Sequence, residues 1–278
     1  MATSKAVTVA PPSQMPAEAG VAQMYAQTKD MRAFVAYAKQ HPESGALAYA
    51  LKSLQKCRVS KEILIRDKAN LQFDQKFPSE HFSARQRSFD YLQYLCQGFS
   101  ADELSDEAVK SLREEAIQKA DPFVKVSTLA TGISTLKDPQ GAALAKNQIM
   151  QAIFAYKDPL LVSDYGINAS NDKTSTGSNF FLNGKSYPVF SDEGIIIHAA
   201  WRLAACEMGG DCSATNEDVI TACIAFARCH TSLAALIKED LMNAGDKNGL
   251  WYERAVSYAR QIIDAIHRGD LQAFRPKQ

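Results

Sequence analysis

The spacing of apolar residues along this chain is overwhelmingly that of amphipathic helices. Asp30, a residue type that favours helix starts, precedes apolar positions three and four residues apart, which share one helix face: Met31, Phe34, Val35 and Ala38. Segment 46–57 repeats the pattern with Leu47, Leu51 and Leu54. Residues 58–80 are ambiguous, and we expect there a short helix over 61–68 followed by a polar connection.

Several later segments begin with sequences typical of helix caps. Ser83-x-x-Gln86 and Ser100-x-x-Glu103 fit the capping box, and Ser105 is a second candidate cap. Asp-Pro pairs at 121–122 and 138–139 combine an N-cap with proline at the first helical position. Further helices are expected over 192–209, after Thr215 and Asn216, over 231–243 and over 248–267.

Helical periodicity is interrupted between residues 168 and 190. Residues 168–179 form a polar stretch rich in Ser, Thr and Asn, which we interpret as a loop. The next residues place Asn183-Gly184 between two aromatic-rich arms, the pattern of a β-hairpin, and Pro188 confines the second arm to a sheet edge. This insertion is predicted to project from the helices and could form the rim of a groove for a partner.

The fold class predicted from these patterns is all-α. We expect a disordered lead-in over 1–20 and a single helical domain over 21–278 with the 168–190 insertion. An Ala-Ile pair followed by an Asp-containing turn recurs at 116–121, 152–158 and 265–270. The recurrence is compatible with a degenerate α-hairpin array of the Sel1 or tetratricopeptide kind. An irregular helical bundle remains the alternative.

Charge and composition argue against two classes of function. Lys+Arg and Asp+Glu both number 31, and no basic cluster of the kind that follows a phosphate backbone is present. No apolar stretch approaches the roughly 20 residues that span a bilayer. We therefore expect a soluble protein with neither a nucleic-acid partner nor insertion into a membrane.

The six cysteines indicate an oxidising compartment. Four of them are spaced C-x5-C-x10-C-x5-C, which is wider than the usual zinc knuckles, although structural zinc and buried free thiols remain alternatives. Of the 15 possible pairings we favour the one that joins the ends of helices: Cys57–Cys96, Cys206–Cys212 and Cys223–Cys229. We expect no metal and no cofactor.

A family resemblance agrees with this location. The segments AYAL (48–51) with Lys56-Cys57, CQGF (96–99) and WRLAAC (201–206), together with the later cysteines, resemble uncharacterised exported proteins of Gram-negative bacteria. Those proteins are helical and faintly Sel1-like. The resemblance implies a periplasmic or secreted protein with disulfides, whose signal peptide would be absent from this sequence, and it implies no catalytic residue.

Sequence motifs for catalysis are almost entirely missing. There is no nucleophile elbow, no zinc-protease motif and no phosphate-binding glycine loop. Three residues of the predicted helix 192–209 remain as candidates. We interpret His198 as a hydrogen-bonded core residue, with a general base facing a cleft as the alternative. Asp192 and Glu193 are interpreted as first-turn anions, with an acid/base or metal-binding pair as the alternative.

These observations favour a non-enzymatic, extracytoplasmic module that binds another protein, such as a scaffold, an inhibitor or an immunity-type partner. Two further hypotheses belong to different classes. One is a periplasmic hydrolase with a site near His198, and the other is a structural subunit of an envelope assembly. A polar cleft around His198 would favour the hydrolase, whereas an apolar concave face would favour the binding module.

Overall fold

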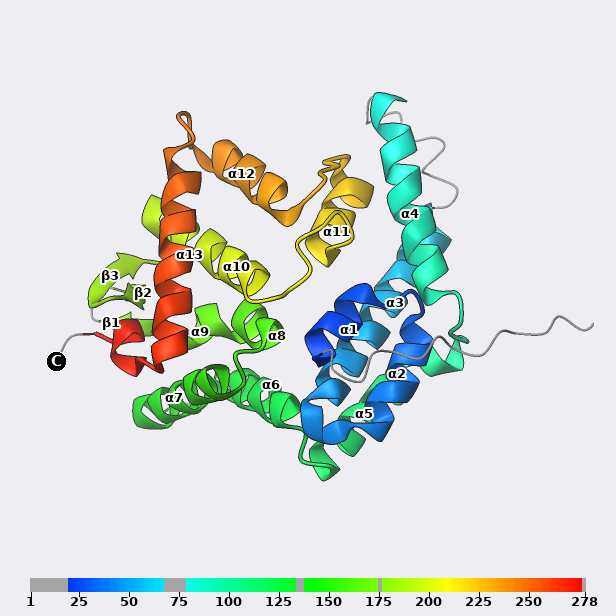
Figure 1. Ribbon diagram of the computed structural model, residues 1–278, viewed down its shortest axis with the longest axis horizontal. Helices are drawn as coiled ribbons and strands as arrows, with labels where there is room; N and C mark the ends of the chain where they lie inside the picture. The colour runs from blue at the N-terminus through cyan, green and yellow to red at the C-terminus, as the bar shows by residue number, and fades with distance from the viewer. Residues whose placement is uncertain (1–19, 68–78, 134–137, 175–176, 277–278) are drawn as a thin grey trace, which may run out of the picture.

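A computed structural model describes residues 20–67, 79–133, 138–174 and 177–276, and it confirms the all-α fold with a small sheet. The expected disordered lead-in lies almost entirely outside these residues. In Figure 1 the long helix α3 is surrounded by α1, α2, α4 and α5, and these five helices are coloured from blue to green. Their bounds are α1 (Val21–Gln27), α2 (Met31–Gln40), α3 (Ala46–Asp67), α4 (Phe82–Cys96) and α5 (Asp106–Gln118).

In the rest of the molecule α10 is central, because it packs against α12, α13 and the short helices that follow α7 (Figure 1). The bounds of the longer ones are α6 (Pro122–Ile133), α7 (Pro139–Tyr156), α10 (Asp192–Glu207), α11 (Glu217–Phe226), α12 (Leu233–Ala244) and α13 (Leu250–Arg268). Between α7 and the sheet lie α8 (Pro159–Leu161), the π-helical turn Val162–Gly166 and α9 (Ile167–Ala169).

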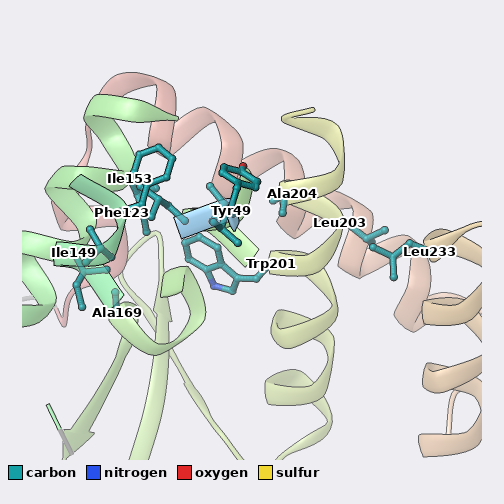
Figure 2. Packing of buried hydrophobic residues seen from close by; sticks show 14 of the residues in the cluster. Tyr49, Phe123, Ile149, Ile153, Ala169, Trp201, Leu203, Ala204 and Leu233 are labelled. Carbon is teal, nitrogen blue, oxygen red and sulfur yellow. The ribbon is translucent and has the colours of Figure 1, made fainter. Parts of the chain in front are cut away.

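The core is continuous from α1 to the C-terminal 3-10 turn Leu271–Phe274. Trp201 of α10 is only 1% exposed and lies among residues of α3, α6 and α7, as Figure 2 shows. Gly166 makes this position possible, since a Cβ there would lie 2.3 Å from the Trp201 ring. The four apolar positions predicted for the face of α2 are all buried.

Aspartate caps fix several helix starts and connect distant segments. The buried carboxylate of Asp121 accepts hydrogen bonds from the backbone N–H groups of Phe123 and Val124, both at 2.9 Å, at the start of α6. It also accepts one at 3.0 Å from the N–H of Leu47, in the first turn of α3. The Asp121 side chain therefore accepts hydrogen bonds from backbone N–H groups at the N-termini of both α3 and α6.

Two local expectations were wrong. The predicted separate helix over 61–68 is instead the end of α3, which continues to Asp67 because no glycine or proline interrupts 46–67. The capping box at Ser83 does not form. A 3-10 turn, Ser79–His81, leads directly into α4 at Phe82, one residue before the proposed cap.

The second capping box is present, together with the alternative cap beside it. Ser100 and Glu103 exchange hydrogen bonds at the 3-10 turn Asp102–Leu104. Ser105 then caps α5, accepting a hydrogen bond from the N–H of Ala108 at 3.1 Å.

Helix packing is that of an irregular bundle. In an α-hairpin array each repeat contacts mainly its sequence neighbours. Here α10 packs most extensively against α13, and α4 packs against α11. Arg85 of α4 reinforces the second contact, because its buried guanidinium donates hydrogen bonds of 3.0 and 2.8 Å to the carbonyl of Ile224 in α11.

The 168–190 segment differs from its prediction in one important respect. The hairpin is present, with Asn183 and Gly184 both at positive φ between β2 (Gly177–Leu182) and β3 (Lys185–Pro188). The expected polar loop, however, contains α9 and a third strand, β1 (Asn171–Thr174), which pairs antiparallel with β2. Phe180, Phe181 and Leu182 are buried, so the end of β2 anchors the segment in the core and the segment does not simply project, although β3 is mostly exposed.

The six cysteines form the three expected pairs. The Cα–Cα separations are 5.4 Å for Cys57–Cys96, 5.4 Å for Cys206–Cys212 and 4.1 Å for Cys223–Cys229. Such a set of disulfides is typical of a protein that folds in an oxidising compartment. Among the described helices, none has the length and apolar character needed to cross a membrane.

Candidate functional site

A cleft of about 780 Å³ lies between the helices around α3 and those around α10. Three helices each contribute a stripe of side chains with helical spacing. The cleft-lining residues on these stripes are Tyr49, Lys52, Lys56 and Val59 of α3, His198, Trp201, Arg202 and Ala205 of α10, and Glu217, Asp218, Thr221, Ala222 and Phe226 of α11. Further polar lining residues come from other segments, among them Tyr25 of α1, Asp164 of the π-helical turn, Asp211, Arg228 and Asp240. The volume of the cleft is in the range of ligand-binding sites.

Two lysines of α3 line this cleft in different electrostatic surroundings. The ammonium of Lys52 lies 3.1 Å from a carboxylate oxygen of Asp164. Burial pushes the pKa of Lys52 down, but Asp164 and Glu217 outweigh that effect and the pKa is raised. Lys56, one turn later, is 8% exposed, and its pKa is lowered because burial outweighs the attraction of Glu217 and Asp211.

The opposite wall is held together by ion pairs between three helices. Arg202 of α10 pairs with Asp218 of α11 at 2.9 Å and with Asp240 of α12 at 3.2 Å. Arg228, in the loop after α11, also pairs with Asp240 and lies 2.6 Å from Glu239. Both guanidinium groups are therefore already occupied by carboxylates, which fixes this wall relative to α10.

Glu217 is an acidic residue of the cleft lining that acts on several groups of the facing wall. It begins α11 and is exposed, and its carboxylate forms no hydrogen bond or ion pair with another described residue. Burial is the largest influence on the pKa values of Tyr25, Lys52 and Lys56 on the facing wall, and the charge of Glu217 acts in the upward direction on all three, although the pKa of Lys56 stays lowered. Asp211 nearby is internally satisfied, since it accepts hydrogen bonds from Ser213 and Thr215.

His198 lies in this cleft and is not a core residue, so the interpretation as a core histidine was wrong. It occupies the exposed stripe of α10 between Ile195 and Arg202, because every third or fourth position of this otherwise buried helix faces outward. Burial by the cleft walls, and next the charge of Arg202, lower its pKa. Within the described part of the chain its ring has no hydrogen-bond partner that would orient it as a base.

The other two candidates lie outside the cleft lining. Asp192 is exposed in the first turn of α10, which Ser191 caps by accepting a hydrogen bond from Gly194 N–H. Glu193 forms an ion pair with Arg254 of α13, and it accepts a hydrogen bond of 3.1 Å from the Tyr258 hydroxyl. These contacts give Glu193 a structural role in joining α10 to α13.

No known protein family, curated protein or solved structure matches the chain. The resemblance to exported helical proteins therefore stays a prediction, and the function has to be argued from the geometry of the cleft. In the described residues, no cluster of three or more His, Cys, Asp or Glu side chains is arranged to hold a metal ion.

Most of the cleft was missed by sequence reasoning. Lys52 and Lys56 resemble ordinary solvated residues of an amphipathic helix, and Tyr25 belongs to a helix of seven residues that no strong periodicity marks. The sequence pattern pointed away from the cleft. Ser53, Lys56 and Ser60 occur at helical spacing in α3, a polar face that a surface helix directs to solvent, yet all three are buried.

Proposed function

We propose that this protein is a non-enzymatic, extracytoplasmic module that binds a segment of another protein in the cleft between α3, α10 and α11. The observation that supports this most is the cleft itself, which has charged walls and two exposed apolar side chains, Val59 and Phe226, at 52% and 61% exposure. A concave surface that combines apolar and charged groups suits recognition of a peptide. The proposal includes scaffolds, inhibitors and immunity-type partners.

Position-specific crosslinking in cells tests the binding proposal. A photoreactive phenylalanine analogue at Phe226, which lines the cleft, should give a discrete adduct with a protein partner. The matched control is the same analogue at Phe190, which is 97% exposed just after the sheet and is not part of the cleft lining. Adducts at Phe190 but not at Phe226 would move the binding surface to the sheet, and absence of adducts at both would refute the proposal.

The extracytoplasmic location has its own test. The proposal is supported by three disulfides that include every cysteine of the chain. Protein isolated from its native cells and alkylated without reduction should carry no labelled thiol in a mass spectrum. Several labelled cysteines would exclude an oxidising compartment.

A hydrolase with a site near His198 is the second candidate, because His198 does line the cleft. Its lowered pKa favours the neutral imidazole that a general base requires at pH 7. A turnover of any ester or peptide probe that His198→Gln abolishes, with the fold intact, would replace the binding proposal by this one.

A further inference from the structure

The ammonium of Lys56 lies in the cleft without a counter-ion. The side chain is buried, and it forms neither an ion pair nor a hydrogen bond with another described residue. Its carbonyl, by contrast, is bonded by the Ser60 hydroxyl within α3. The stem of Lys56 is buried while its ammonium reaches the open space of the cleft, where it loses part of its hydration and gains no compensating charge.

Lys52, one turn before Lys56 in α3, has a charge that is compensated by a carboxylate. It has the same charge, belongs to the same helix stripe and lines the same cleft, but Asp164 neutralises it at 3.1 Å. No carboxylate of the described chain does this for Lys56. The through-space attraction of Glu217 and Asp211 is weaker than the effect of burial. The unbalanced charge is thus confined to one position of the cleft.

A second polar group is unsatisfied in the same cleft. The Tyr25 hydroxyl is buried and has no hydrogen-bond partner among the described residues, and its ring packs against Tyr49 with 5.2 Å between centroids. An ammonium and a phenol are both hydrogen-bond donors. Two donors without acceptors, one of them cationic, suit an anionic acceptor supplied from outside the chain.

The surrounding charges select the kind of anion. Arg202 and Arg228 are engaged by carboxylates, so neither arginine of the described cleft lining offers a free guanidinium fork to a phosphate. Glu217 and Asp164 also line the cleft and would repel a dianion more than a single negative charge. Val59, one turn beyond Lys56, and Phe226 provide apolar contact beside the charge.

We propose that Lys56 and Tyr25 bind a carboxylate of the partner segment, next to an apolar side chain that contacts Val59 and Phe226. This inference rests on the proposed function and names the chemistry of the ligand. The carboxylate belongs to an acidic side chain or to a chain terminus, two sources with the same chemistry that separate peptides distinguish.

Three synthetic tripeptides test the inference by calorimetry on the full chain. Acetyl-Leu-Glu-Phe-amide carries only a side-chain carboxylate, acetyl-Leu-Gln-Phe as the free acid carries only a terminal one, and acetyl-Leu-Gln-Phe-amide carries none. At least one of the two anionic peptides should bind, at least about tenfold more tightly than the neutral peptide. Equal binding of all three, or binding of none, overturns the inference.

Variants locate the binding charge. Lys56→Met should weaken the anionic peptide about tenfold or more, and Tyr25→Phe, which removes one hydroxyl from an intact ring, should weaken it about threefold. Glu217→Gln should strengthen it, because the facing negative charge is removed. Lys110→Met, at a lysine 77% exposed on α5, is the control and should bind as the native protein does.

The two proposals fail in different ways. If Lys56→Met binds the peptide with native affinity, the carboxylate inference is wrong, whereas crosslinking at Phe226 still decides whether the cleft receives a protein. If Glu217→Gln instead abolishes binding, the recognised group is a cation and the assignment of the ligand is reversed.

Discussion

The 168–190 segment and the cleft between α3, α10 and α11 differ in how their sequence relates to their place in the structure. In the first, residues 168–179 are the longest polar stretch in the body of the chain, yet they contribute to two strands of a three-stranded sheet, whose middle strand is buried at Phe180, Phe181 and Leu182. The second is made of residues that look like ordinary helix positions, yet they gather unbalanced charges in one concavity. Local polarity is therefore a poor guide to which residues of this chain are buried and which line a cleft.

The largest expected effect tests the sheet side of this comparison. Phe180→Ala removes a ring that is 5% exposed within the main core, and it should lower the free energy of unfolding by about 3–5 kcal/mol in denaturant titrations. Phe190→Ala, at a ring 97% exposed, is the matched control and should change it by less than about 0.5 kcal/mol. A small effect of Phe180→Ala would restore the view that the segment projects from the fold.

The difference between the two regions also marks what the sequence can predict. Helix faces such as that of α2, cap residues such as Asp138, and the Asn183-Gly184 turn depend on local spacing and local chemistry, and these predictions are confirmed. The third strand, Asn171–Thr174, could not be predicted, because its sequence does not alternate apolar and polar residues. It forms by pairing with β2, which folding brings beside it.

The cleft was harder to predict because its residues are brought together by tertiary packing. Lys56 and Glu217 are 161 positions apart, and nothing in the sequence of either segment indicates that α3 and α11 line one concavity. His198 was correctly noticed but wrongly placed. A helix as apolar as α10 appears buried on every side, so its exposed stripe is invisible until the surrounding helices are known.

The second expected effect concerns the disulfide at the cleft wall. Cys206–Cys212 closes a loop with a sequence separation of 6 that holds Asp211 beside the cleft. Replacing both cysteines by alanine should lower the free energy of unfolding by about 2–3 kcal/mol on the chain-entropy estimate. Removing Cys57–Cys96, with a separation of 39, should cost about 4 kcal/mol in the same titration. Unchanged stability of the first variant would mean that the wall is held by its ion pairs alone.

A third effect has the opposite sign. Lys56→Met replaces a side chain that is 8% exposed and has no counter-ion by an apolar chain of similar length, and it should raise the free energy of unfolding by about 1 kcal/mol at pH 7. Lys52→Met should lower it, because Asp164 then loses its cation. A loss of stability in Lys56→Met would show that the ammonium is balanced within the fold and would weaken the case for an external carboxylate.

The pH dependence of this effect follows from the direction of the pKa shift. The folded pKa of Lys56 is lowered, so between that value and the unfolded pKa of about 10.4 the unfolded chain binds more protons. Stability of the native protein therefore rises with pH over this range, relative to the methionine variant. The advantage of Lys56→Met should be complete below the folded pKa and vanish above about pH 10.4, as paired titrations at several pH values will show.

The smallest expected effect decides between the two roles of His198. Because the side chain is exposed in the cleft and has no hydrogen-bond partner in the described structure, His198→Gln should change the free energy of unfolding by less than about 0.5 kcal/mol. Its lowered folded pKa means that the native protein loses stability relative to the variant as pH falls below about 6.5, since the unfolded chain then binds more protons. A loss of 1 kcal/mol or more at pH 7 would instead indicate a buried hydrogen bond and return His198 to the core. If the stability of His198→Gln is unchanged, its affinity for the anionic peptide can be compared with that of the native protein. Native affinity would leave the proposed carboxylate site at Lys56, whereas a large loss of affinity would extend that site across the cleft to α10.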